Sequence, residues 1–210
     1  MKNTRLVLGL ICLVACTILF NTAPVYATDG PMEAIKGPVD ELISILRDPI
    51  YKETGKKPEQ REKLVMLIKK FFDFKQMTRL TLATNWKKFS PAQREAFIAV
   101  FTDFLAGVYI NRIQGEYQNE TVAYLDQKLL SPKKALVHTK IKREAADIPV
   151  SYRLYKSNKG WLTYDVIIEK VSLVQNYRAQ FKRFLAKNSL EALMDQLRKK
   201  TAENKETAGK

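Results

Sequence analysis

The sequence predicts an α+β domain in which an antiparallel or mixed sheet of about four strands packs against several helices. Three observations support this fold class: helical periodicity over residues 38–117, an alternating pattern over residues 121–171, and a return to helical periodicity from residue 172. Consecutive strands joined by short turns favour an antiparallel meander. The order of helices, then strands, then helices is typical of α+β proteins. With 210 residues, 46% of them hydrophobic, the chain can bury one core.

The first 27 residues have the layout of a secretory signal peptide. Lys2 and Arg5 precede an uninterrupted apolar run over residues 6–20, and Val25-Tyr26-Ala27 fits a small-residue cleavage site. The apolar run is too short for a membrane span. We therefore expect a periplasmic protein, with a single domain over residues 28–198 and a polar, frayed tail over residues 199–210.

A lipoprotein is the alternative reading of the same segment. Leu13-Val14-Ala15-Cys16 resembles a lipobox, in which Cys16 would be lipid-modified, but the apolar run continues past this cysteine. Cys12 is the other cysteine of the chain. Cleavage after Ala27 removes both, which excludes disulfides, thiol catalysis and thiolate metal sites from the mature chain.

The charge is strongly basic. The chain has a formal net charge of +14, and loss of the two basic residues of the leader leaves +12. Because we expect the protein to be exported, we do not expect its basic surface to bind nucleic acid. A solvated basic surface accounts for much of it, and such a surface is drawn to anionic lipid headgroups by up to ~1 kcal/mol per basic residue.

Helices are expected first. Residues 38–47 carry one apolar face and end at Asp48-Pro49, a second helix opens at Pro58, and a break at Asp73-Phe74 leads to a short helical piece over residues 75–83. Ser90-Pro91-Ala92-Gln93 predicts a capping box that opens a long helix, to about residue 117. Gly107 lies inside this helix, either for close helix packing, which we prefer, or to leave room for a ligand chain.

Strands follow. Residues 121–129 form a weak strand, and residues 135–142 and 148–155 alternate apolar with polar side chains. After a turn over residues 157–160, the apolar stretch of residues 161–171 forms the central strand. Ser172 and Gln175 then predict a capping box, so that this strand runs almost directly into a helix. Ser189 caps a last helix.

This arrangement sets an apolar helix face against an apolar sheet, and a cavity between such layers is a common place to hold an apolar ligand. The alternative is an ordinary core, which composition does not exclude. The candidate lining positions are the apolar residues of the strands and of the two helices that face them: Phe101, Leu105, Val108, Tyr109, Val137, Ile141, Val150, Tyr152, Leu154, Trp161, Tyr164, Val166, Ile168, Val174 and Tyr177.

The sequence offers little for catalysis. His138 is the one histidine of the chain, on the Lys-rich face of its strand, so neither a general base nor a zinc site is expected. Nucleophile-elbow, P-loop and dinucleotide motifs are missing from the sequence. Asp165 lies inside an apolar strand, where a carboxylate is more often satisfied by a hydroxyl, an amide or an arginine than used as a base.

Several stretches together resemble the MlaC family of periplasmic phospholipid-binding proteins, also called toluene-tolerance auxiliary components of an ABC transporter. They are Phe72-Asp73-Phe74, Trp86, residues 90–97 (SPAQREAF), 150–154 (VSYRL), 161–166 (WLTYDV) and 169–174 (EKVSLV). One departure is Lys170, where the family often has Gly, which predicts a less tight turn.

The resemblance implies a carrier without cofactor or catalytic residues. Nothing in the sequence pattern demands more than a monomer, so a monomer is expected. Its NTF2-like pocket between sheet and helices would hold the acyl tails of a glycerophospholipid. It would exchange this cargo between an outer-membrane lipoprotein–porin complex and an inner-membrane ABC transporter with an MCE-domain subunit, maintaining outer-membrane lipid asymmetry. Alternatives are a hopanoid or sterol carrier of the same family, a small enzyme that uses Asp165 as base, and an adaptor without a ligand.

Overall fold

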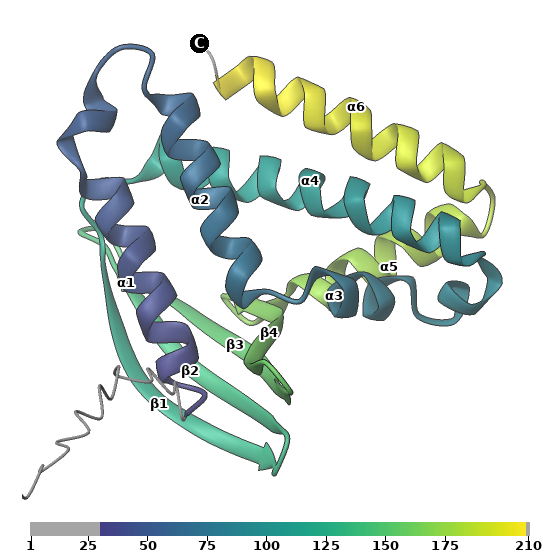
Figure 1. Cartoon of the computed structure of the whole chain (residues 1–210), viewed down its shortest axis with the longest axis horizontal. Helices are drawn as coiled ribbons and strands as arrows, with labels where there is room; N and C mark the ends of the chain where they lie inside the picture. The colour runs from purple at the N-terminus through teal and green to yellow at the C-terminus, as the bar shows by residue number, and fades with distance from the viewer. Residues whose placement is uncertain (1–29, 209–210) are drawn as a thin grey trace, which may run out of the picture.

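A computed structural model of the chain describes residues 30–208, so the predicted leader and both cysteines lie outside the described residues. The fold is α+β, as predicted (Figure 1). The helices are α1 (Glu33–Arg47), α2 (Lys57–Phe71), α3 (Phe74–Leu82), α4 (Pro91–Glu116), α5 (Leu173–Leu185) and α6 (Leu190–Ala208), with 3₁₀ turns at Pro49–Lys52 and Ala83–Lys88. The strands are β1 (Thr121–Ser131), β2 (Lys134–Lys142), β3 (Ile148–Ser157), β4 (Gly160–Ile168) and the two-residue β5 (Val171–Ser172).

The sheet is an antiparallel meander with the order β1-β2-β3-β4-β5, as the short connections predicted. Its register places Val137 opposite Tyr152, and Tyr152 opposite Val166, so these three side chains share the face that the helices cover. The hairpin of β1 and β2 extends beyond the helices (Figure 1), which leaves Leu129 and Leu130 exposed.

Side-chain caps define where the helices begin. Asp73 accepts a hydrogen bond from the Gln76 N–H at 2.8 Å and starts α3. Ser90 and Gln93 form the predicted capping box of α4, with both reciprocal hydrogen bonds present. Ser189 accepts from the Ala192 N–H at 3.1 Å at the start of α6. Each cap satisfies a backbone donor that has no partner within its helix.

Two helix boundaries differ from expectation. Helix α1 begins at Glu33 rather than near Pro38, because its first turns bury Ala34 and Ile35 against the sheet and tolerate Pro38 inside the helix. Helix α6 continues to Ala208, through residues predicted to be a frayed tail. Helix α6 packs along α4 (Figure 1), and this contact keeps the residues helical although their polar composition predicts fraying.

The connection from β4 to α5 is also different from the predicted direct run. The strand ends at Ile168, and Glu169 and Lys170 make a two-residue turn with φ of 48° and 70° before β5 pairs back on β4. Non-glycine residues rarely adopt these left-handed angles. Ser172 then accepts from the Gln175 N–H at 3.1 Å and starts α5. The turn is therefore tight even though position 170 carries a lysine and not a glycine.

Helix α4 is the centre of the helical layer. It is the one described helix that is long and apolar enough to cross a membrane, yet Phe97, Phe101 and Ile110 are almost fully buried within the fold. A Cβ at Gly107 would lie 3.6 Å from the Cγ2 atom of Thr201 on α6. Gly107 therefore faces α6 at an ordinary van der Waals distance, which fits helix packing rather than room for a ligand chain.

Candidate functional site

A cavity of about 330 Å³ lies between the covered face of the sheet and helices α1 to α4. Its apolar walls come from every one of these layers. They consist of Val39, Leu42, Ile43 and Leu46 of α1; Ile68, Phe71, Phe72, Phe74 and Met77 around α2 and α3; Leu105, Ala106, Tyr109, Ile110 and Ile113 of α4; and Val122, Ile141, Ile148, Val150, Tyr152, Val166, Ile168 and Leu173 of the sheet and the start of α5.

The cavity occupies one end of the covered sheet face. At the other end Ala135, Val137, Leu154 and Trp161 are closed off by the first turns of α1 and by Phe71. Toward the open end, Ile141, Ile148 and Ile168 are only half-buried although helices cover them, because part of their surface faces the cavity. Apolar surface left without contacts in this way favours an apolar occupant.

Tyr152 is the polar group in the floor of the cavity. Its hydroxyl is hydrogen-bonded to Thr139, and burial raises the pKa of Tyr152 to about 12 despite this contact. The hydroxyl is therefore neutral at physiological pH. Across the cavity, burial also raises the pKa of Tyr109, whose hydroxyl is hydrogen-bonded to Tyr177. Both hydroxyl groups are paired with protein, which leaves the interior apolar.

Charged side chains line the cavity at one end only, where β1 and β3 begin and β2 and β4 finish. Arg143 donates to Glu120 at 3.1 Å and to Glu116 at 3.5 Å, and Arg112 donates to Glu116 at 2.9 Å. Arg47 joins this group through Tyr117, at 3.0 Å. We call these residues the charged rim; it is partly exposed, with 69% of the Arg112 side chain accessible. A ligand in the cavity would reach solvent here.

The structure places seven of the fifteen sequence-predicted positions in the cavity wall: Leu105, Tyr109, Ile141, Val150, Tyr152, Val166 and Ile168. The other eight lie elsewhere. Val137, Leu154 and Trp161 are in the closed end of the sheet, while Phe101, Val108, Tyr164, Val174 and Tyr177 belong to or pack on the core cluster of α3 to α6. Six of these eight are buried in the two core clusters, while Val108 and Tyr164 are half-buried against the cluster of α3 to α6.

Sequence reasoning missed the contribution of α1 and of the α2–α3 corner. The stripe of Val39, Leu42, Ile43 and Leu46 was recognised as a helix face, but its period is the same for a core contact and for a cavity wall. The charged rim was also missed. Arg112 and Glu116 stand four residues apart on one helix, a spacing that predicts the ion pair but not its place beside a cavity.

Asp165 is buried and its carboxylate does not line the cavity. It accepts hydrogen bonds from Arg153 at 2.9 Å, from the Ser172 hydroxyl at 2.7 Å and from the Val174 N–H at 3.0 Å. A guanidinium, a hydroxyl and an amide thus satisfy it, as the sequence favoured. The carboxylate holds the start of α5 on β4, which is a structural role.

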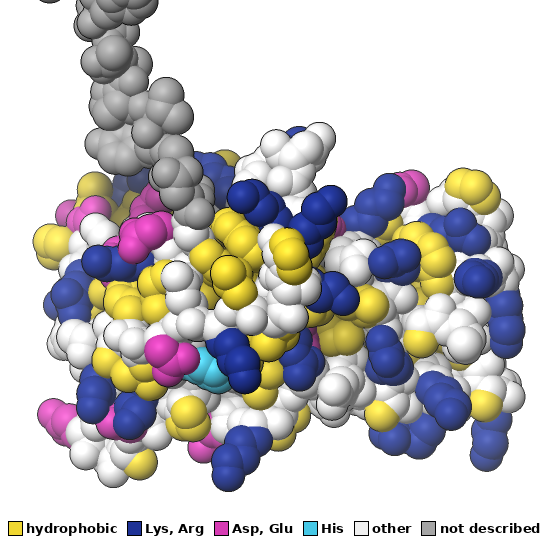
Figure 2. Space-filling view, turned by 90° about the horizontal axis from the view of Figure 1, so that it is seen from below, with side chains coloured by type: hydrophobic (Ala, Val, Ile, Leu, Met, Phe, Trp, Pro, Cys, Tyr) yellow, Lys and Arg dark blue, Asp and Glu magenta, His cyan; other side chains and the backbone are white. Residues whose placement is uncertain are grey.

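His138 lies on the outer face of the sheet, away from the cavity. It is hydrogen-bonded to Ser151 at 2.8 Å and lies 4.0 Å from the Asp126 carboxylate. Figure 2 shows this face, on which Lys and Arg side chains are spread rather than gathered in one patch. Among the described residues, three or more His, Cys, Asp or Glu side chains nowhere gather as they would to hold a metal ion.

Comparison with solved structures identifies a similar fold. A phospholipid-binding protein from Ralstonia solanacearum, solved in complex with a phospholipid at 1.53 Å, superimposes with a TM-score of 0.73. The two chains share 24% sequence identity over 82% of this chain and 97% of the other. The MlaC protein family model matches residues 36–199, which include every residue that lines the cavity. With this match over most of its length, the chain belongs to the MlaC family.

Proposed function

We propose that this protein is a periplasmic carrier that holds the acyl chains of a glycerophospholipid in the cavity between sheet and helices. The observation that carries the proposal is an apolar cavity with a charged rim at one end, in a chain of the MlaC family. The phospholipid complex of the Ralstonia protein, which has the same fold, supports it.

The chemistry of the cavity matches this cargo. Each CH₂ group moved from water to an apolar site is worth about 0.8 kcal/mol, so a free two-chain lipid in water is very unfavourable. Transfer from a bilayer to an apolar cavity is close to neutral by comparison. The carrier therefore needs no chemical energy of its own, and donor and acceptor proteins set the direction of transfer.

The headgroup would stay at the charged rim. Arg47, Arg112 and Arg143 can meet a phosphate there, and their partners Glu116 and Glu120 keep the rim from being strongly cationic. Because the rim is partly exposed to solvent, its charged side chains interact only weakly with the rest of a headgroup. We therefore expect several headgroup classes to bind.

The route of the cargo is part of the proposal. The leader-like residues 1–27 support export to the periplasm. Family membership supports exchange between an outer-membrane lipoprotein–porin complex and an inner-membrane ABC transporter with an MCE-domain subunit, in the service of outer-membrane lipid asymmetry. A monomer is sufficient for this role, since the cavity is complete within one chain.

Mass spectrometry of the purified mature protein tests the proposal. The protein is expressed in a bacterial host without added lipid, and native and denaturing spectra are compared. We expect near-stoichiometric diacyl glycerophospholipid of more than one headgroup class. A polycyclic lipid would instead favour a hopanoid or sterol carrier, and a bare protein that takes no lipid from vesicles would refute the proposal.

A matched pair of variants assigns the lipid to this cavity. Ile168 lines the cavity, whereas the neighbouring Ile167 points to the opposite face of the same strand, and both are half-buried. Ile168→Glu should reduce bound lipid by about tenfold, since a carboxylate beside an acyl chain loses its hydration. Ile167→Glu should keep the lipid. Equal effects of the two changes would place the lipid elsewhere.

A further inference from the structure

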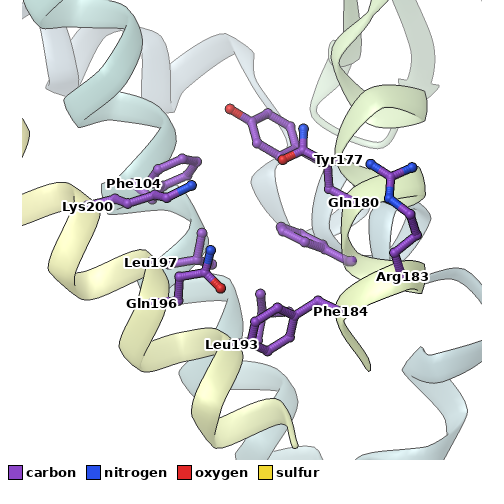
Figure 3. A pocket seen from close by; sticks show the side chains of 10 residues that line it. Phe104, Tyr177, Gln180, Arg183, Phe184, Leu193, Gln196, Leu197 and Lys200 are labelled. Atoms are coloured by element: carbon purple, nitrogen blue, oxygen red, sulfur yellow. The ribbon is translucent and has the colours of Figure 1, made fainter. Parts of the chain in front are cut away.

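A second groove of about 340 Å³ lies between α5 and α6, over α4 (Figure 3). Helix α6 packs mainly on α4, whereas α5 packs mainly on α3, so the two helices do not close on each other along their length. We call this the α5–α6 groove. It is lined by Phe104, Tyr177, Gln180, Phe181, Arg183, Phe184, Leu193, Gln196, Leu197 and Lys200.

The floor of the α5–α6 groove is apolar and largely aromatic. Phe104 and Tyr177 make an edge contact with ring centroids 5.8 Å apart, and Phe181 lies 5.7 Å from Tyr177. Leu193 and Leu197 face these rings from α6 (Figure 3). These side chains already belong to the buried core cluster, so the floor is rigid and preformed.

The lips of the groove are polar and basic. Gln180 and Arg183 come from α5, Gln196 and Lys200 come from α6, and the lining includes no acidic side chain. Within the part of the chain that the structure describes, neither Arg183 nor Lys200 has an ion pair or a hydrogen bond through its side chain. Arg112 and Arg143, by contrast, are neutralised at the charged rim of the main cavity.

The groove is separate from the main cavity. Leu105 and Tyr109 of α4 face the main cavity, while Phe104 faces the groove. The hydroxyl groups of Tyr109 and Tyr177 are hydrogen-bonded to each other, and this pair lies between the two spaces. A molecule in one space therefore does not fill the other.

We propose that the α5–α6 groove is a second binding site, which takes a single acyl chain with an anionic headgroup. The chain would lie over the half-buried Phe184 and the small exposed parts of the other floor side chains, where each methylene taken out of water raises affinity by about fourfold. The headgroup would lie between Arg183 and Lys200, and the carboxamides of Gln180 and Gln196 can donate to its oxygens.

Calorimetry on the full mature protein, purified with its lipid, tests this site. The probes share a twelve-carbon chain and differ in headgroup: dodecanoate, dodecyl phosphate, dodecyl maltoside and dodecyltrimethylammonium. We expect both anions to bind with a stoichiometry near one and the cation to bind at least tenfold more weakly. The carboxylate and phosphate arms distinguish a fatty acid from a lysophospholipid-like headgroup.

Charge reversal locates the headgroup. Arg183→Glu combined with Lys200→Glu should weaken dodecanoate binding by about tenfold or more. The matched control is Lys182→Glu combined with Lys199→Glu, which makes the same charge change at exposed neighbours outside the groove. All four positions are exposed, so both double variants should fold. Equal losses in the two double variants would overturn the proposal, as would equal binding of all four probes.

Lipid retention separates this proposal from the proposed function. If dodecanoate occupies the groove, the diacyl lipid stays bound during the titration, and mass spectrometry finds both ligands on one protein. If dodecanoate displaces the diacyl lipid one for one, it binds in the main cavity and the groove proposal fails, while the carrier proposal stands. If the protein carries no diacyl lipid but still binds dodecanoate through Arg183 and Lys200, the groove proposal stands alone.

Discussion

The Ser172 hydroxyl donates a hydrogen bond of 2.7 Å to the Asp165 carboxylate, which joins the end of β5 to the middle of β4. The same carboxylate receives the Val174 N–H at the first turn of α5. A negative charge at this place favours the helix N-terminus as well as its free N–H groups. The strand and the helix are therefore fixed to each other by one buried side chain.

Asp165→Asn should lower the free energy of unfolding by about 1–3 kcal/mol, because the amide replaces an acceptor with a donor and leaves Arg153 without its charge partner. Urea denaturation measures this loss. Asp126→Asn, at an exposed carboxylate, is the control and should change stability by less than about 0.5 kcal/mol. The folded Asp165→Asn variant should still carry lipid. Loss of lipid without loss of stability would mean that Asp165 has a functional role and not only a structural one.

Lys170→Gly should stabilise the protein by about 0.5–1.5 kcal/mol, since Lys170 has a φ of 70° that glycine adopts without steric cost. The midpoint of urea denaturation should rise. Lys170→Ala removes the same charge and keeps a Cβ atom, so it should give no such gain. A gain of equal size from Ala would attribute the effect to charge rather than to backbone conformation.

Arg112→Glu at the charged rim should shift the bound lipid from anionic toward zwitterionic headgroups by about fivefold, the equivalent of ~1 kcal/mol per basic residue near a headgroup. Mass spectrometry of extracted lipid measures the ratio. Arg198→Glu on α6 makes the same change at an exposed arginine outside the cavity lining and should leave the ratio unchanged. An unchanged ratio in Arg112→Glu would mean that the headgroup does not lie at this rim.

Removal of the lipid should lower the melting temperature by about 5–10 °C, because a ligand at about a hundred times its Kd stabilises the folded state by about 2.7 kcal/mol. Calorimetric scans before and after delipidation measure the shift, and reloading from vesicles should reverse it. The Ile168→Glu variant should show little response to reloading. A delipidated protein with unchanged melting temperature would contradict a cavity that lipid fills.

Local sequence patterns predicted the helix starts and the sheet because their causes are local. Ser90 and Gln93 cap α4 through atoms within one turn, and the alternation in β2 and β3 follows from which face meets the core. The cavity is different, since it depends on the gap left between layers. Phe101 and Tyr177 have the same apolar character as Leu105 and Tyr109, yet the first pair is packed against other rings and only the second pair faces the cavity.

The turn between β4 and β5 was also not predicted from the sequence, and the reason lies in its backbone conformation. Glu169 and Lys170 are ordinary strand or helix residues by composition, and the sequence gives no glycine to mark a left-handed turn there. The turn forms because pairing of Ile168 with Val171 and the hydrogen bonds of Asp165 hold its two sides together. Tertiary contacts of this kind outweigh local preference.

The meander also has a consequence for how the protein folds. Each strand pairs with its sequence neighbour, which keeps the loop-closure entropy small, whereas α1 reaches the sheet through contacts such as the hydrogen bond from the Met32 N–H to Gln127, 95 positions away. We expect the sheet to form early and α1 to dock late. Pulse-labelled hydrogen exchange would test this order by comparing the amides of β3 with those of α1. Until α1 docks, one wall of the cavity is absent, so on this order the cavity is completed only at the last step of folding.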